Sequence, residues 1–272
     1  ALNDGTTLPD IGFGTYPLRG DEGTAAVLDA LAIGYRLIDT AVNYRNEDAV
    51  GRAIAQTDVP RSDIVVTTKL PGRDHGYDET LRSFERSAAA LGLDVIDLYL
   101  IHWPNPSVGK YVDAYRAMVR LREEGRVRTV GVSNFTQEHL ARVADATGVM
   151  PAVNQVEMHP FFPQVELRAF HAAHGIVTEA WSPLGKAAPV KQAAPVVAAA
   201  RAHGVTPAQV VLRWHLQLGS VPIPKSADPG RRRENLDVFG FELTDDEVAA
   251  ITALGRPDGR LFGGDPNVHE EM

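Results

Sequence analysis

Cysteine is absent from the 272 residues of this chain. Its absence excludes disulfides, catalysis by a thiolate and metal sites built on cysteine ligands. Long hydrophobic runs are missing as well, because no apolar stretch approaches the roughly 20 residues that a membrane-spanning helix needs. The first five residues, 1–5, have neither the basic nor the apolar region of a signal peptide. We therefore expect a cytoplasmic protein with no membrane partner.

Basic residues are in short supply. The chain has 27 lysines and arginines against 35 acidic residues, which gives a net charge of −8. A nucleic-acid-binding protein needs a basic surface, so we expect no nucleic-acid partner. The hydrophobic content of 44% is ordinary for a globular protein with a sizeable core. The length suits one α/β barrel, which typically takes about 250 residues, so we expect a single domain over residues 1–272.

Short strand-like runs alternate with helical segments along the whole chain. The eight runs are residues 11–15, 36–39, 64–69, 97–103, 128–133, 152–156, 176–181 and 221–224. Eight such alternations favour a (β/α)8 barrel of the TIM type, in the α/β class, over an open sheet. Before the first run, Asp4 and Gly5 lie between short apolar flanks, a pattern typical of a tight turn. This predicts an N-terminal β-hairpin that closes the bottom of the barrel.

Three of the strand-like runs end in or next to a residue that can carry charge. Two runs end at Asp39 and Lys69, the run 97–103 ends with His102 and Trp103, and Tyr44 follows Asp39 by five positions. In a parallel barrel the C-terminal ends of the strands meet at one mouth, where active sites lie. The sequence therefore predicts that a carboxylate, an ammonium, an imidazole and a phenol meet at this mouth.

These four residue types form a coherent set for proton transfer. A tyrosine has a reference pKa of about 10, and a nearby ammonium lowers it toward useful acid strength. Lys69 could supply that charge to Tyr44, with Asp39 as its counter-ion. His102 could orient or polarise a carbonyl oxygen. Any one of these residues alone is more simply explained as a strand cap or a rim ion pair, but four together favour chemistry.

A second local feature is basic and follows the last strand-like run. Lys225, Ser226 and Arg231 precede or begin a short predicted helix in residues 223–235. A lysine, a hydroxyl and an arginine beside a helix N-terminus make a phosphate site. The alternative is a solvated basic helix. Because the chain as a whole is acidic, we favour a bound anion.

Other motifs fail on inspection. Gly12 and Gly14 begin like a dinucleotide fingerprint, but Pro17 stands where the third glycine is required. His171 and His174 are three apart on a predicted helix without an evident third ligand, so we expect a solvated helix face and no metal site. Residues 185–195 are predicted to form a loop and candidate lid. Residues 256–272 are predicted to form an irregular tail over the surface.

The motifs taken in order resemble the aldo-keto reductases over nearly the whole chain. Within that family the chain looks like the bacterial branch near the 2,5-diketo-D-gluconate reductases. The matching segments are residues 39–44, 68–70, 98–104, 131–135, 153–160, 181–185 and 223–226. The resemblance implies a (β/α)8 barrel that binds NADP(H) and passes a hydride to a substrate carbonyl. It implies that Tyr44 donates the proton, that Lys69 and Asp39 tune Tyr44, and that His102 positions the carbonyl.

The resemblance also implies the residues that bind the cofactor and the substrate. Ser133, Asn134 and Gln155 match the contacts to the carboxamide, and Trp181 matches the ring that stacks on the nicotinamide. Lys225, Ser226 and Arg231 match the contacts to the 2′-phosphate, and Glu234 and Asn235 match the adenine end. The remaining implied cofactor contacts are Gly14, Thr15, Asp39, Ser182, Leu184 and Gly185. The implied substrate contacts are Tyr16, Asn43, Tyr44, His102 and Trp103.

The leading hypothesis is an NADPH-dependent reductase of small aldehydes, ketones, dicarbonyls or keto-sugar acids. Asp228 lies where a small hydroxyl residue is expected, and its charge weakens the predicted preference for NADPH over NADH. The alternative is a catalytically silent NADP(H)-binding barrel, which would need a damaged tetrad. A Schiff-base enzyme using Lys69 is disfavoured, because Asp39 and Tyr44 would keep that amine charged. By resemblance we expect a monomer.

Overall fold

The computed structural model describes residues 1–186, 188–261 and 263–272. Ala187 in the predicted lid and Phe262 in the predicted tail lie outside the described residues. The described residues contain an eight-stranded parallel sheet in the order β1 to β8. The strands are β1 (Phe13–Gly14), β2 (Leu37–Asp39), β3 (Val65–Leu70), β4 (Ile96–Ile101), β5 (Val127–Ser133), β6 (Val153–Glu157), β7 (Val177–Trp181) and β8 (Val221–Pro222).

The first and last strands meet and close the sheet into a ring. The backbone N–H of Gly12 donates to the carbonyl oxygen of Pro222 at 3.0 Å, and that of Gly14 donates to Pro224 at 3.0 Å. A closed ring leaves the sheet without an exposed edge. The predicted (β/α)8 barrel is therefore confirmed.

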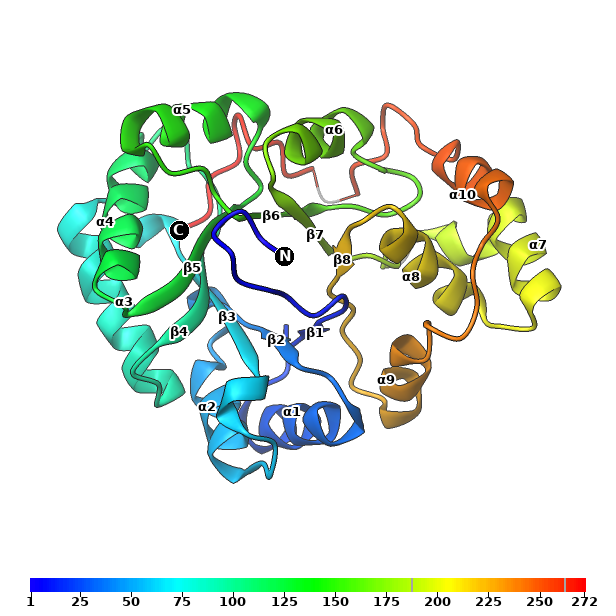
Figure 1. Cartoon of the computed structure of the whole chain (residues 1–272), viewed down its shortest axis with the longest axis horizontal. Coiled ribbons are helices and arrows are strands. Elements are labelled where there is room, and N and C mark those ends of the chain that lie inside the picture. Colours follow the sequence, from blue (N-terminus) through cyan, green and yellow to red (C-terminus); the bar gives the residue numbers. More distant parts are fainter. Residues whose placement is uncertain (187, 262) are drawn as a thin grey trace.

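Helices surround the ring of strands, as Figure 1 shows. The larger helices are α1 (Gly20–Ile33), α2 (Glu47–Gln56), α3 (Tyr77–Leu91), α4 (Tyr111–Glu123), α5 (Gln137–Thr147), α6 (Val165–Ala173), α7 (Ala194–His203), α8 (Pro207–Gln217), α9 (Pro229–Leu236) and α10 (Asp245–Thr252). Short 3-10 helices are η1 (Val42–Tyr44), η2 (Arg61–Asp63), η3 (Gly72–Asp74) and η4 (Pro189–Gln192). The last of these lies within the predicted lid, which is thus partly ordered as a helical turn.

Local sequence signals explain where several helices begin and end. Thr136, Thr206 and Thr244 each form a capping box with the residue three positions later, at the starts of α5, α8 and α10. Such a box satisfies backbone donors that a helix N-terminus leaves unpaired. At the other end, Gly34 and Gly92 follow α1 and α3 with positive φ angles, which glycine adopts readily at a helix C-terminus.

Strand alternation divides the core into two parts. Ile38, Leu70 and Ile101 point away from the barrel axis and belong to the large core that packs the strands against the helices. Leu37 and Leu100 point the other way, into small apolar clusters inside the ring. Because side chains alternate along a strand, the next inward positions after Leu37 and Leu100 are Asp39 and His102.

The N-terminal segment differs from the prediction. Residues 1–12 are all described and form a turn without paired strands, closed by a hydrogen bond from Leu2 N–H to the Thr6 carbonyl at 2.8 Å. Asp4 accepts hydrogen bonds from both the backbone and the hydroxyl of Thr6, which stabilises the turn. Leu2 packs with Leu98 and Leu100 inside the ring. The segment thus covers the barrel interior as an apolar plug, not as a hairpin (Figure 1).

The chain after α10 also departs from the prediction. It has little regular structure, as expected, but it does not stay on the outer surface. His269 lies against the ring of Trp103 with centroids 4.1 Å apart. Asn105 donates a hydrogen bond to the backbone carbonyl of Glu271. The tail therefore crosses the mouth of the barrel, where these side chains offer it aromatic and polar contacts.

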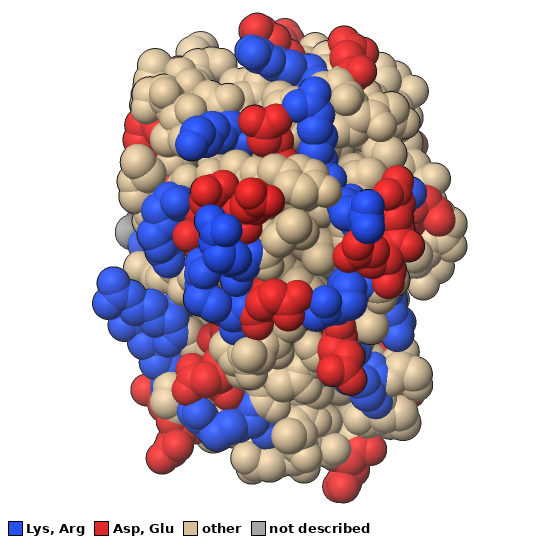
Figure 2. All heavy atoms as spheres, turned by 90° about the vertical axis from the view of Figure 1, so that its left-hand side faces the viewer, with Lys and Arg blue, Asp and Glu red and all other residues tan. Residues whose placement is uncertain are grey.

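Charged side chains of both signs are interspersed on the face formed by α3 and α4 (Figure 2). Arg120 and Glu124 pair at 2.6 Å, and Arg126 and Glu85 pair at 3.0 Å. Exposed pairs such as these contribute at most about 1 kcal/mol each. In the described part of the chain, no helix combines the length and the apolar character needed to cross a bilayer.

We predict that Gly51→Ala destabilises the protein by about 1–3 kcal/mol, as expected of overpacking. A Cβ at Gly51 in α2 would lie 2.6 Å from the carbonyl oxygen of Leu91, a backbone atom that moves only if α3 moves. Urea unfolding would measure the change. Gly240→Ala is the matched control, because its Cβ would meet no atom within 4 Å. Equal stability of the two variants would contradict the prediction.

Candidate active site

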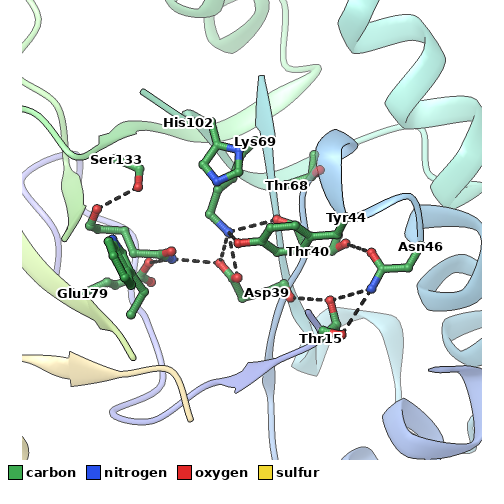
Figure 3. A network of polar contacts seen from close by, with 12 residues as sticks. Thr15, Asp39, Thr40, Tyr44, Asn46, Thr68, Lys69, His102, Ser133 and Glu179 are labelled. Atoms are coloured by element: carbon green, nitrogen blue, oxygen red, sulfur yellow. Dashed lines mark hydrogen bonds and ion pairs between the residues drawn. The ribbon is translucent and has the colours of Figure 1, made fainter. Parts of the chain in front are cut away.

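Inward side chains from five strands meet at one end of the barrel, where Asp39, Lys69, Gln155 and Glu179 form a continuous polar network and His102 lies beside it (Figure 3). Asp39 ends β2, Lys69 lies near the end of β3, and His102 directly follows β4. Gln155 and Glu179 come from β6 and β7, on the other side of the ring. The structure therefore brings together the residues predicted from the strand ends and adds an acid, Glu179, that was not predicted.

Lys69 is the centre of this network. Its Nζ donates to both carboxylate oxygens of Asp39, at 2.7 and 2.8 Å, and to the Thr40 carbonyl at 3.1 Å. It also lies 3.3 Å from the Tyr44 hydroxyl. Lys69 is 0% exposed and Asp39 is 3% exposed, so this ion pair is shielded from water. A buried charge needs such a partner, and Lys69 has one that contacts it through two oxygens.

Lys69 and Tyr44 both keep their protons at neutral pH. Burial lowers the pKa of Lys69, but Asp39 and then Tyr44 raise it more, so that it ends above its ordinary value. Burial raises the pKa of Tyr44 to about 12, and Lys69 opposes this effect only in part. We expected Lys69 to bring the pKa of Tyr44 below its ordinary value, and the burial of the phenol overrides that effect. Tyr44 is therefore a protonated phenol beside a fixed ammonium.

His102 is a neutral imidazole next to this pair. Burial, then the positive charge of Lys69 and His269, holds the pKa of His102 well below its ordinary value. Its ring stands edge-on to the Tyr44 ring at 5.7 Å. A neutral imidazole can donate one hydrogen bond and accept another. His102 can therefore hold an oxygen atom beside Tyr44 without carrying charge.

A group of amide and hydroxyl side chains occupies the far side of the mouth. Asn134 has a left-handed backbone with φ of 61°, and its amide donates to the His102 carbonyl at 3.0 Å. Its Oδ1 accepts a hydrogen bond from the indole of Trp181 at 2.8 Å. Ser133 donates to the backbone of Gln155 at 2.7 Å. These contacts fix both the amide of Asn134 and the plane of the Trp181 ring.

Glu179 is the residue that sequence reasoning missed. It is 0% exposed and accepts from Gln155 Nε2 at 2.8 Å, while the same nitrogen donates to Asp39 at 2.8 Å. Burial, followed by the charge of Asp39, raises the pKa of Glu179 to about 7. Glu179 lies two residues before Trp181 on β7, so the two side chains share one face of the strand. This spacing could have indicated Glu179 in the sequence. Gln155 thus connects two buried acids.

The basic segment after β8 forms a loop that leads into α9. Ser226 and Asp228 bond within the loop, since Asp228 N–H donates to the Ser226 hydroxyl at 3.1 Å. Asp228 is the N-cap of α9, and its carboxylate accepts from the Arg231 N–H at 2.8 Å. The aspartate that seemed out of place in the sequence therefore caps a helix. Lys225 and Arg231 are exposed on the loop, where they can meet an anion.

Two charged residues beside this loop are engaged within the protein. Arg232 is buried, donates to Asp29 of α1 at 2.7 Å and to the Ser226 carbonyl at 3.1 Å, and so ties the loop to the barrel. Glu234, predicted to lie at the adenine end, accepts from the Thr206 hydroxyl at 2.8 Å. Arg232 was not predicted, because a run of three arginines does not tell which one points inward.

The other predicted cofactor contacts lie near the strand ends. Thr15 is buried and donates to the backbone of Asp39 at 2.8 Å. Gly14 in β1 lies close to the segment that follows β8, since a Cβ at Gly14 would lie 3.2 Å from the Ile223 carbonyl oxygen. Ser182 and Gly185 form a tight turn, with Leu184 partly buried within it. Asn235 is buried in α9.

The predicted substrate contacts divide into exposed and covered residues. Tyr16 is 53% exposed, with its ring 5.2 Å from that of Tyr44. Asn43 accepts a hydrogen bond from Arg73. Trp103 is covered by the tail. The structure brings these residues to the same mouth, but the tail already occupies part of it.

His171 corrects one sequence expectation. It is 1% exposed and not solvated, and it contacts Asn154 at 3.0 Å and Thr178 at 2.8 Å. Burial lowers its pKa to about 4, so it is neutral. His171 therefore links α6 to β6 and β7, while His174 is exposed as predicted.

The barrel and its site match a known family. A sequence profile of the Aldo/keto reductase family matches residues 10–256. The chain belongs to the aldo/keto reductase family. Membership makes this protein an oxidoreductase that acts on carbonyl groups, as the sequence predicted.

Relatives of this aldo/keto reductase resemble it over their full length. The 2,5-diketo-D-gluconic acid reductase B of Corynebacterium sp. (strain SHS752001) is 58% identical, covering 100% of this chain and 98% of the relative. An aldo-keto reductase of Mycolicibacterium smegmatis is 51% identical, covering 97% of this chain and 95% of the relative. The crystal structure of a Gox0644 mutant in complex with NADPH has a TM-score of 0.95 and 49% identity, covering 99% of this chain and 97% of that chain.

We predict that Glu179 makes this reductase less stable as the pH rises. Its folded pKa of about 7 lies above the ordinary 4.5, so the folded state retains a proton that the unfolded state loses. Stability from this group is therefore present below pH 4.5 and is lost between about pH 4.5 and 7, by roughly 3 kcal/mol in total.

Glu179→Gln removes this titration. The unfolding free energy of this variant and of the wild type would be measured in urea. The variant's value minus the wild-type value should increase by about 2–3 kcal/mol as the pH rises from about 5 to 8. The exposed Glu123→Gln should track the wild type over the same range. Parallel pH curves for wild type and Glu179→Gln would show that Glu179 does not titrate in this window.

Proposed function

We propose that this protein reduces the carbonyl group of a small molecule to an alcohol, with NADPH as the reductant and Tyr44 as the proton donor. The observation that carries the proposal is the position of Lys69, whose Nζ contacts both Asp39 and the Tyr44 hydroxyl. That arrangement holds a positive charge beside the one phenol O–H that neighbours His102. The arrangement supports a site that donates a proton to the carbonyl oxygen of a substrate.

The residues divide the chemistry as follows. Bound NADPH supplies the hydride for the carbonyl carbon. Tyr44 passes its hydroxyl proton to the carbonyl oxygen, and Lys69 stabilises the phenolate that remains, because its charge lies next to that oxygen. Asp39 keeps Lys69 charged and in place. The neutral His102 donates an N–H to the carbonyl oxygen and so sets its direction toward Tyr44.

The donor groups at the mouth fit NADPH. Lys225 and Arg231 would meet the 2′-phosphate beside the N-terminus of α9, where anions bind well. Asn134 would hold the carboxamide of the cofactor, and Trp181 would stack on its ring. The relative that carries NADPH, the Gox0644 mutant, has the same fold over nearly its whole length. NADH lacks the 2′-phosphate and would bind less tightly.

The substrate class follows from the relatives. Because the diketo-D-gluconic acid reductase of Corynebacterium is 58% identical, we assign this protein to dicarbonyls and keto-sugar acids, beside simple aldehydes and ketones. The silent NADP(H)-binding alternative is disfavoured, because Asp39, Tyr44, Lys69 and His102 are all present. The single domain over residues 1–272, the monomeric state and the cytoplasmic location stay predictions, which limited proteolysis, sedimentation and cell fractionation would test.

Tyr44→Phe should lower kcat by a factor of about 100 to 10,000, as expected when a general acid is removed. The assay is NADPH oxidation with methylglyoxal, followed by the loss of reduced-nicotinamide absorbance. Binding of NADPH, measured by quenching of tryptophan fluorescence, should stay within about threefold, since the phenol is not assigned a cofactor contact. Tyr77→Phe, on the exposed start of α3, is the control. Full activity of Tyr44→Phe would remove Tyr44 from the mechanism.

Asp228→Ser should tighten NADPH binding by about twofold to fivefold, because it removes a negative charge that repels the 2′-phosphate, and a charge at a helix N-terminus contributes up to about 1 kcal/mol. Serine can still cap α9, so the helix start is preserved while the negative charge beside the phosphate is lost. Fluorescence titration with NADPH and NADH measures the effect. The NADH affinity should be unchanged, and an equal gain for both cofactors would mean that the charge does not act on the 2′-phosphate.

A further inference from the structure

The tail that crosses the barrel mouth places one carboxylate against the residues assigned to the substrate. Asn43 donates from Nδ2 to Glu271 Oε1 at 2.7 Å. Glu271 Oε2 lies 3.1 Å from Nδ1 of His102. The Glu271 side chain is 22% exposed and that of His102 is 10% exposed, so this contact is largely closed to water.

Backbone contacts hold Glu271 in this position. Asn105 Nδ2 bonds to the Glu271 carbonyl, and Asn43 Nδ2 lies 3.2 Å from the Met272 carbonyl. Gly72 lets the tail approach, because a Cβ there would lie 2.1 Å from the Glu271 carbonyl oxygen. The tail is thus fitted between the loops that follow β3 and β4. No local feature of the sequence indicates this contact, because these loops are far from the tail in the sequence.

The surroundings of Glu271 disfavour its charged form, and the neighbouring positive groups oppose this effect only in part. Burial raises the pKa of Glu271, while the Asn43 hydrogen bond, Lys69 and Arg73 oppose that rise. Glu271 in turn helps to raise the pKa of Tyr44, after burial and Asp39. The Glu271 carboxylate therefore interacts with the charges of the proton-donor unit.

Neither Oε2 of Glu271 nor Nδ1 of His102 has a hydrogen bond of good geometry among the described residues. Both atoms are buried, and an unpaired buried polar atom is costly. The contact between Glu271 and His102 is therefore weaker than a hydrogen bond. An oxygen atom that approached the imidazole in better alignment would bind it more favourably. A ligand that offers such an atom gains by displacing Glu271.

We propose that Glu271 is an internal ligand of the carbonyl subsite and a residue that determines substrate affinity. This rests on the proposed function, since it assigns the carbonyl oxygen to His102. The oxygen of a substrate and the carboxylate of Glu271 require the same imidazole and the same Asn43 amide. The tail withdraws before the carbonyl reaches Tyr44, and each substrate binds with its affinity reduced by the competition. Substrates that replace both contacts of the carboxylate displace it best.

Kinetics of tail variants test the competition. Glu271→Ala should lower the KM for methylglyoxal with NADPH by about threefold to tenfold and leave kcat within about twofold, because ground-state competition is removed and the reacting groups are untouched. Glu271→Gln keeps the shape and should lie between Glu271→Ala and the wild type. Glu270→Gln is the matched control, because Glu270 bonds the backbone of Ser107 and not His102. An unchanged or raised KM in Glu271→Ala, or a kcat that falls with KM constant, overturns the proposal.

Acetate supplies a second readout that does not depend on turnover. With NADP+ bound, acetate should enter the vacated subsite of Glu271→Ala and change the tryptophan fluorescence, since Trp103 adjoins the tail. The wild type and Glu270→Gln should give no acetate response at the same concentrations. Equal responses in wild type and Glu271→Ala overturn the internal-ligand assignment. If no variant, wild type included, oxidises NADPH with any carbonyl, the proposed function fails, while the acetate titration still decides whether Glu271 fills a carboxylate-binding site.

Discussion

The ion pair between Lys69 and Asp39 is the interaction on which the rest of the site depends. An ammonium with no exposure to water is held because a carboxylate contacts it through two oxygens, at 2.7 and 2.8 Å. Leaving either charge buried without the other would cost about 3–5 kcal/mol, so the two residues are fixed together. Their fixed geometry places the ammonium 3.3 Å from the Tyr44 hydroxyl. The proposed proton donor, Tyr44, is thus positioned by a stability requirement.

The barrel makes this pair possible through its regular alternation. Asp39 and Lys69 come from neighbouring strands, β2 and β3, and both point inward because the strands run parallel with matched registers. Across the ring, Gln155 connects Asp39 to Glu179. The polar network therefore spans the barrel from β3 to β7 and is enclosed by apolar side chains below and by the loops above. A substitution at one residue of this network would therefore change the electrostatic environment of the others.

The two ends of the barrel mouth differ in the charged groups that they present. At one end, Lys225 and Arg231 stay exposed, while Arg232 is buried and holds their loop against α1. At the other end, the tail brings Glu271 to a neutral imidazole. In the proposed function, the phosphate of the cofactor would meet the exposed Lys225 and Arg231, whereas a substrate oxygen would have to displace Glu271.

The sequence alone determined the barrel, the family, the three residues at the strand ends and Tyr44 shortly after the first of them, because hydrophobic alternation and strand-end position are local signals that the chain carries directly. It also located the basic loop after the last strand. Tertiary structure alone decided which arginine of three is buried, that residues 1–12 plug the barrel without pairing as strands, and that Glu179 and Glu271 reach the site. Each of these depends on contacts between segments far apart in the chain. Burial likewise decided the pKa of Tyr44, because the loss of solvent around a side chain follows from packing and has no local sequence signal.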